Sequence, residues 1–140
     1  MCSGGQDEQG FQANIAIGFR CLAAAAHAEP GNPAWQADWG RALGLLGDLD
    51  AARVHYETAV SLAPQDALYL RLLAEFSMRY EVDVANLGLP AARQALALQP
   101  QDAAVLDLLG EVYLALGNDA LAERFIRRAV LSQAEYAPAW

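Results

Sequence analysis

Basic residues are scarce in this sequence of 140 residues, which contains no lysine at all. Its 9 basic residues are all arginines and face 17 acidic residues, so the formal net charge is −8 and the pI is about 4.5. Proteins that bind nucleic acid or anionic membranes need a basic patch or stripe. The sequence therefore predicts neither kind of partner, and solubility explains its acidity better than a dedicated basic partner does.

Cysteine and histidine are also rare, with two residues of each. No Cys-x-x-Cys, no His-x-x-x-His and no glycine-rich phosphate loop occurs, so the sequence predicts no metal, cofactor or nucleotide site. A disulfide between Cys2 and Cys21 is not expected, because Cys2 lies in a Ser-Gly-Gly tail. We interpret His27 and His55 as surface or partly packed side chains.

The acidic side chains do not form a catalytic set. A nucleophile, a base and an orienting group would have to converge on one pocket, whereas these carboxylates are scattered over helix starts and helix faces. Capping and solvation account for them, and no enzymatic activity is predicted. The residues concerned are Asp48, Asp50, Asp83, Asp107, Glu111 and Glu123.

Long apolar runs are missing too. No run approaches the roughly 20 residues that a membrane-spanning helix requires, and the N-terminus shows no basic and apolar signal segment. We therefore predict no membrane insertion. Cys2-Ser3-Gly4-Gly5 resembles the start of a processed bacterial lipoprotein, but an ordinary flexible tail over residues 1–10 is the favoured interpretation. The localisation stays open between the cytoplasm and a membrane-anchored position that faces an extracytoplasmic space.

What the sequence does contain is an internal repeat. Residues of alternating size reappear seventy positions further along the chain. Repeated supersecondary units bury their apolar faces only against their neighbours, so the sequence predicts a stack of such units and, with it, a binding surface. The repeated residues are Gly40, Leu43, Gly47, Ala52, Tyr56 and Ala59, which correspond to Gly110, Tyr113, Gly117, Ala122, Ile126 and Ala129.

A third copy lies between these two. A shift of 34 residues carries Gly40 onto Ala74, whereas a shift of 36 carries Ala59 onto Ala95. Two additional residues are therefore predicted in an unusually apolar connection over 80–89. We expect this connection to fold back over the second helix of its own copy, and a flap that binds a partner is the alternative.

A helical hairpin of this length, with small, large and small side chains and a closing proline, resembles the tetratricopeptide repeat. The resemblance implies an all-α fold, a right-handed superhelical stack of helix-turn-helix repeats. The middle copy departs from the family pattern at Gly88 and Ala92, and Ala134 stands where the family has proline. The matching residues are Trp39, Gly40, Leu43, Ala52, Tyr56, Ala59 and Pro64 in the first copy and Leu106, Leu109, Gly110, Tyr113, Ala122, Ile126 and Ala129 in the third.

We expect one domain of repeats over residues 11–136. An apolar stripe at helical spacing predicts an N-terminal helix at 11–29, and residues 137–140 echo the opening of the first repeat and are expected to start a truncated fourth. Gly47 and Gly117 are expected to end helices that Asp48 and Asn118 follow as caps. The repeats are expected at about 33–66, 67–102 and 103–136, with helices near 33–46, 49–62, 66–79, 90–98, 102–116 and 119–132.

In proteins similar to this one, the first helix of each repeat lines a concave groove. The resemblance therefore predicts that the chain binds a peptide or a helical segment of a partner protein there, with arginines and carboxylates around apolar anchors. Ordinary solvated helix faces are the competing interpretation. The groove residues are Arg41 and Leu45 in the first repeat, Leu68, Arg71, Glu75, Met78 and Arg79 in the second, and Asp107, Glu111 and Leu114 in the third.

Two other roles are kept as alternatives. The last predicted helix carries Phe125, Ile126, Val130 and Leu131 without a polar terminal helix to cover them, so the chain is expected to be a fragment of a longer protein or a scaffold that associates end to end. The segment Arg93–Pro100 is similar to the tetratricopeptide domain of bacterial cytochrome c maturation proteins, which implies an apocytochrome partner. Family members that grip a C-terminal carboxylate use lysine and asparagine in the groove, so that partner is not predicted.

Overall fold

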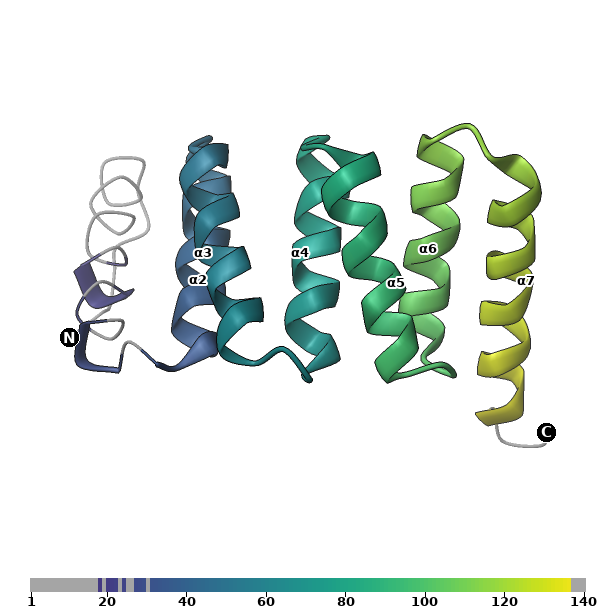
Figure 1. The fold of residues 1–140 in the computed structure, drawn as a ribbon, viewed down its shortest axis with the longest axis horizontal. Helices are drawn as coiled ribbons and strands as arrows, with labels where there is room; N and C mark the ends of the chain where they lie inside the picture. Colours follow the sequence, from purple (N-terminus) through teal and green to yellow (C-terminus); the bar gives the residue numbers. More distant parts are fainter. Residues whose placement is uncertain (1–17, 19, 23, 25–26, 30, 137–140) are drawn as a thin grey trace, which may run out of the picture. The chain divides into compact units, whose positions relative to one another are not determined.

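The computed structural model describes residues 18, 20–22, 24, 27–29 and 31–136, and each regular element in these ranges is helical (Figure 1). The predicted all-α fold of helix-turn-helix repeats is confirmed. The chain divides into two compact units, residues 1–62 and 63–140. The first holds α2 (Pro33–Leu45) and α3 (Leu49–Leu62), and the second holds α4 (Ala67–Tyr80), the π-helical turn η1 (Val84–Gly88), α5 (Leu89–Leu98), α6 (Ala103–Ala115) and α7 (Asp119–Tyr136).

Some predictions concern the ends of the chain. The described residues between 18 and 28 are helical, but most of the helix predicted at 11–29 lies outside the described residues, as do the tail at 1–10 and the repeat start at 137–140. Cys21 is disulfide-bonded, so the expectation that no disulfide forms is wrong. A cysteine within a short polar tail belongs to no periodic pattern that would have indicated its position.

The first unit is one helical hairpin whose ends follow the predicted signals. Asn32 Oδ1 accepts a hydrogen bond of 3.0 Å from the backbone N–H of Ala34 and so caps α2. Gly47 takes a left-handed conformation with φ of 86°, which ends the helix and favours glycine. Asp48 Oδ1 then accepts from the N–H of Ala51 at 3.3 Å and caps α3.

The small residues of the repeat let paired helices approach closely, as predicted. A Cβ atom on Gly40 would lie 2.9 Å from Cδ2 of Tyr56, and one on Gly110 would lie 2.5 Å from Cγ1 of Ile126. Non-bonded carbon atoms do not approach each other this closely. A larger residue at either position therefore has to push away the opposite side chain and the helix that carries it. The large side chain of each copy therefore fills the space that its glycine leaves.

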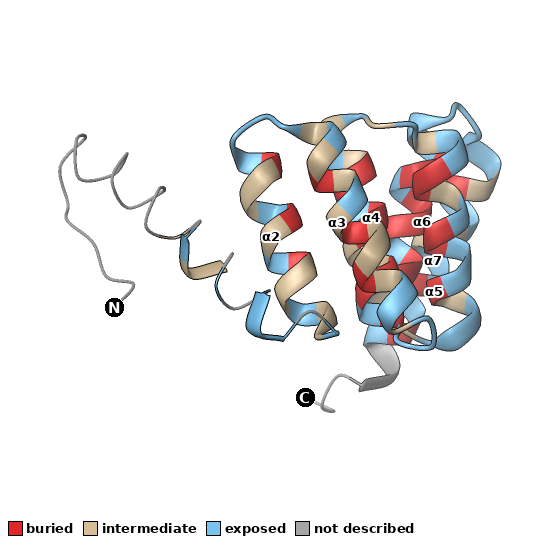
Figure 2. Cartoon of the chain, turned by 60° about the vertical axis from the view of Figure 1, so that its left-hand side comes forward, coloured by how far each residue is buried: buried red, intermediate tan, exposed pale blue. Residues whose placement is uncertain are grey.

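In the second unit the four α-helices lie in chain order, and each packs on the next (Figure 1). Figure 2 shows buried residues in red on these helices. The largest fully buried side chains among the described residues belong to this unit. α4 also contacts α6 directly, so the first helices of consecutive repeats are neighbours. The side chains at the centre are Leu106, Leu109, Val105 and Val112 on α6 and Ser77 on α4.

The apolar connection after α4 is mostly helical. Glu81 and Asp83 have positive φ values of 54° and 46°, and η1 then runs into α5 without a break. The Ser77 hydroxyl donates a hydrogen bond of 2.6 Å to the carbonyl oxygen of Val82, and Leu87 is buried. The connection therefore packs on the repeats, but the prediction that it folds back over its own second helix is wrong: η1 extends α5 backwards and packs against α4 and α6.

The last helix exposes less apolar surface than the sequence suggested. The Phe125 ring stacks on the Tyr113 ring of α6, with centroids 5.5 Å apart and an interplanar angle of 8°. Ile126 lies against Gly110. Among residues 119–133 of this helix, whose burial the structure describes, the exposed large apolar side chains are Val130 and Leu131, each 60% exposed. Phe125 and Ile126 therefore belong to the hairpin and are not part of a terminal face.

His55 gives the first unit a predicted pH response. Its Nδ1 lies 2.8 Å from Oε1 of Gln36, its ring centroid lies 5.6 Å from that of Trp39, and burial lowers its pKa below 6.5. Because the unfolded chain binds the proton more readily, this part of the stability is present above about pH 6.5 and is lost as the pH falls through the folded pKa. Lowering the pH from about 7.5 to about 5.5 should reduce the urea midpoint slightly.

The measurement uses His55→Gln beside the wild type. The variant should lose part of that pH dependence, and the NMR titration of the His55 ring in the wild-type protein should have its midpoint below about 6.5. A midpoint at or above this value would contradict the burial of the imidazole.

Candidate functional site

The exposed face of α4 carries the predicted residues of the second repeat. They recur at intervals of three and four residues, which places them along one side of the helix. Glu75, Arg79 and Leu68 are exposed, with Leu68 at 42%, whereas Arg71 and Met78 are half-buried. The opposite side of α4 is committed to the core through Leu70, Leu73, Ala74 and Ser77.

Arg71 is the most unusual side chain on this face. Its Nε lies 3.5 Å from Oε1 of Glu75, and the two side chains are 30% and 49% exposed. The Nε atom is buried and has no hydrogen-bond partner among the described residues. A buried donor without an acceptor costs about 1–3 kcal/mol, and an exposed pair at this spacing returns only about 0.3–0.5 kcal/mol. Because Nε itself is buried, a carboxylate from outside the chain can reach only the exposed part of the Arg71 side chain, which is 30% exposed.

The exposed face of α6 carries the predicted residues of the third repeat. Asp107, Glu111 and Leu114 are exposed and lie on one side of the helix, since they follow one another by four and three residues. Neither carboxylate forms an ion pair or hydrogen bond with another residue of the described part of the chain. The α6 row is therefore an acidic strip that ends in an apolar side chain, 51% exposed.

The second unit brings these two rows onto neighbouring helices. α4 contributes arginines and α6 contributes carboxylates, and Leu68 and Leu114 are exposed apolar residues beside them. The other two predicted groove residues, Arg41 and Leu45, lie on α2 in the first unit, where both are exposed. The arrangement suits the binding of a chain that carries both charges, and it offers no nucleophile paired with a base.

The sequence did not indicate a ladder, that is, a series of contacts between aromatic rings and guanidinium groups formed by Arg93, Tyr113, Phe125 and Arg128. Arg93 of α5 donates to the Tyr113 hydroxyl from Nε at 3.1 Å and from Nη2 at 2.7 Å. Tyr113 stacks on Phe125, and the guanidinium carbon of Arg128 lies 5.5 Å from the Phe125 ring centroid. The ladder ties α5, α6 and α7 together, and no spacing rule relates residues on three different helices.

Sequence reasoning also missed a basic hollow on α7 of ≈ 380 Å³. Arginines at 124, 127 and 128 were its only signal, in a chain that is otherwise poor in basic residues. A second hollow of ≈ 460 Å³ lies between residues 63–67 and the end of α5, lined mainly by small and amide side chains.

The described residues offer neither a cluster of metal ligands nor a helix that could span a membrane. Within the described ranges, no three or more His, Cys, Asp or Glu side chains gather as a metal would need. None of the helices in these ranges combines the length and the apolar character that crossing a bilayer demands.

Comparison with known proteins yields one family match and a set of similar folds. The tetratricopeptide repeat profile matches residues 40–66. A crystal structure of MamA superposes with a TM-score of 0.74 at 18% identity, covering 94% of this chain and 78% of that one. The MamA structure designated MSR-1 C2 gives 0.72 at 15% identity, covering 88% and 70%. A MamA RS-1 double mutant gives 0.74 at 17%, covering 92% and 69%. No curated protein matches significantly by sequence.

Proposed function

We propose that this chain, whose residues 40–66 match the tetratricopeptide repeat and whose fold is that of helical repeats, binds a peptide or a helical segment of a partner protein along the exposed rows of α4 and α6. Proteins of this repeat type serve as interaction modules and scaffolds. Arg41 and Leu45 of α2 lie in the first unit, and their part in binding stays a prediction from the sequence.

The observation that carries this proposal is the pairing of unlike charges on neighbouring helices, with Arg71 on α4 and the exposed carboxylates of Asp107 and Glu111 on α6, which form no ion pair with another described residue. A carboxylate of the partner would accept hydrogen bonds from the guanidinium group, and such charge-assisted bonds are about twice as strong as neutral ones. A basic side chain of the partner would face Asp107 and Glu111. Apolar side chains between them would cover Leu68, Met78 and Leu114.

The free energies of the ion pairs and apolar contacts expected at this surface predict a modest affinity for a peptide. Exposed ion pairs contribute about 0.2–1 kcal/mol each, and burying one large apolar side chain contributes about 1.5–3 kcal/mol. A few contacts of each kind add to the binding free energy, and the ordering of the peptide subtracts from it. The balance corresponds to a Kd of about 1–100 µM.

A peptide selection tests the proposal. A displayed library of random 15-residue peptides, about the length of four helical turns, is selected on the wild-type chain and on Asp107→Arg/Glu111→Arg. The wild type should enrich peptides with an acidic and a basic end around apolar residues, and the variant should enrich peptides without the basic end. Enrichment of the same sequences by both chains, or of none by the wild type, would sink the proposal.

A scaffold that assembles from its own copies is the second candidate, and the exposed Val130 and Leu131 of α7 favour it. The hypothesis of an apocytochrome partner stays a narrower prediction, which rests on the resemblance of the segment Arg93–Pro100.

A further inference from the structure

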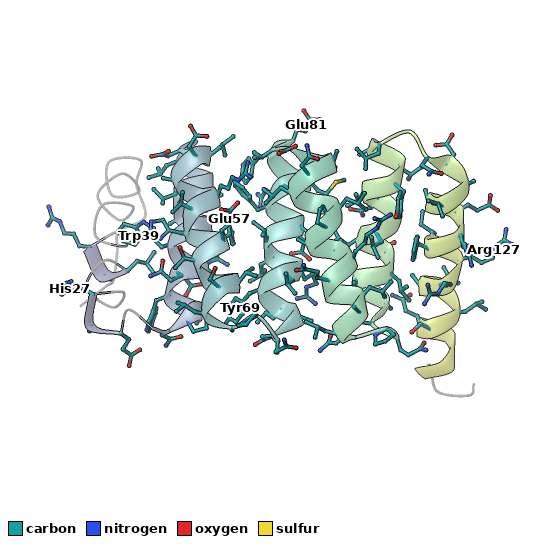
Figure 3. The ribbon with its side chains drawn as sticks, in the orientation of Figure 1. His27, Trp39, Glu57, Tyr69, Glu81 and Arg127 are labelled. Carbon is teal, nitrogen blue, oxygen red and sulfur yellow. The ribbon has the colours of Figure 1, made fainter. Side chains whose placement is uncertain are left out.

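α7 presents a second charged face, of the sign opposite to that of the α6 row. Arg124, Arg127, Arg128 and Leu131 line its hollow of ≈ 380 Å³ together with Ala120 and Glu123. The four residues are exposed, and Arg127 points away from the helix (Figure 3). This is an arginine-rich surface on a chain whose net charge is −8.

Two of these arginines have no carboxylate partner among the residues whose side chains the structure describes. Arg127 pairs with Glu123 on its own helix, where both side chains are about 70% exposed. Arg128 lies over the Phe125 ring, and Arg124 makes no ion pair with another described residue. The α7 face therefore holds free positive charge, as the α6 row holds free negative charge.

The two faces match in spacing as well as in charge. Asp107, Glu111 and Leu114 follow one another by four and three residues, and so do Arg124, Arg128 and Leu131. With a rise of about 1.5 Å per residue, two parallel helices would bring the three pairs into register. The pairs are Asp107 with Arg124, Glu111 with Arg128, and the exposed Leu114 with the exposed Leu131.

These pairs cannot form within one copy. α6 and α7 are consecutive antiparallel helices that face each other through Gly110 and Ile126 and through Tyr113 and Phe125. Their exposed rows lie on the sides that this contact leaves free, and parallel alignment requires a helix from another molecule.

We propose that the basic face of α7 docks on the α6 row of a second copy of this chain. The inference rests on the proposed function, because the α6 row is part of the proposed binding surface, and it names one partner for it. Since α6 and α7 are antiparallel in each copy, the contact can form twice about a two-fold axis or once per copy in a longer series.

Sedimentation velocity of the full chain, up to about 300 µM, tests the proposal. The wild type should associate with increasing concentration. Arg124→Glu/Arg128→Glu makes both faces acidic and Asp107→Arg/Glu111→Arg makes both basic, so each variant alone should associate at least about tenfold more weakly. Their equimolar mixture should associate as the wild type does, because each acidic face again meets a basic one.

The control is Asp38→Arg/Asp50→Arg, which changes the net charge as Asp107→Arg/Glu111→Arg does but lies on α2 and α3; it should associate like the wild type. Leu131→Ser should weaken the contact as well. A wild type that stays monomeric, a mixture that stays dissociated, or charge variants that behave like the control would overturn the inference. Circular dichroism verifies that every variant remains helical.

The two proposals fail separately. If the wild type stays monomeric while the peptide selection enriches charge-complementary sequences, only the second copy is excluded as partner. If reversing Asp107 and Glu111 changes neither the selected peptides nor the association, both proposals fail.

Discussion

Replacing Arg71 by glutamate and Glu111 by arginine in one chain is expected to abolish binding of a peptide selected on the wild type. Each substitution turns an attractive contact with the peptide into a repulsive one. The repulsion is stronger at position 71, because the side chain there is partly buried and less screened by water. Like charges brought together at an interface cost several kcal/mol. We expect Kd to rise at least about 100-fold, or about 2.7 kcal/mol, measured by isothermal titration calorimetry.

Arg53 and Glu57 provide the matched control. They form an ion pair at 2.8 Å on α3, so the exchange Arg53→Glu/Glu57→Arg makes the same chemical changes away from the proposed surface. This exchange should leave peptide binding unchanged. A peptide with its charged ends inverted should bind Arg71→Glu/Glu111→Arg in preference to the wild type. Binding that survives reversal of Arg71 and Glu111, or that is lost equally in the control, would contradict the assignment.

Replacing Gly110 by leucine is expected to cause a large loss of stability. Its Cβ alone would lie 2.5 Å from Cγ1 and 3.2 Å from Cδ1 of Ile126, and 3.4 Å from the carbonyl oxygen of Ala122. The Ala122 carbonyl oxygen is already at contact distance from the Cβ, so the three further carbon atoms of leucine find no room beside Ile126; α7 has to move and its contact with Tyr113 is disturbed. Overpacking of this kind costs about 3 kcal/mol or more, which lowers Tm by about 10 °C.

Ala115→Leu adds the same side chain at an exposed position at the end of the same helix. Its effect on the free energy of unfolding should stay within about 0.5 kcal/mol. Urea unfolding followed by circular dichroism compares the two variants. If Gly110→Leu unfolds at the same urea concentration as Ala115→Leu, the close approach of α6 and α7 is not a determinant of stability.

The fold could be predicted because its physical constraints recur along the chain. Gly40 and Gly110 occupy the same place opposite Tyr56 and Ile126, and two copies of one contact are much easier to recognise than a single copy. The turns at Gly47 and Gly117 recur for the same reason, with φ values of 86° and 79°.

The middle copy shows where prediction stops. Its connection contains the additional residues, so no second copy exists for comparison, and η1 could not be recognised. There Gly88 meets Ser77, since a Cβ on Gly88 would lie 2.7 Å from the Ser77 hydroxyl. This contact differs from the contacts of Gly40 with Tyr56 and of Gly110 with Ile126 in the other copies. The Ser77 hydroxyl is fixed by its hydrogen bond to the Val82 carbonyl oxygen, which has no sequence signature.

The candidate site could be predicted only in part. Helical periodicity separates exposed positions such as Asp107 and Glu111 from the core, because exposed rows are the complement of buried ones. Phe125 was misplaced because its partner, the Tyr113 ring, lies on another helix. The sequence alone does not show that the acidic residues of α6 and the basic residues of α7 could bind each other between copies. The structure does, because it leaves both rows exposed.

The most direct test of the proposed binding surface is an NMR titration of the isotope-labelled chain with a selected peptide. Saturable chemical-shift changes are expected for the backbone amides at 68–79 of α4 and 104–114 of α6. They should disappear in Arg71→Glu/Glu111→Arg and persist in Arg53→Glu/Glu57→Arg. Shifts confined to the hollow at residues 63–67 and 98–99, or no saturable shift on α4 and α6, would contradict it.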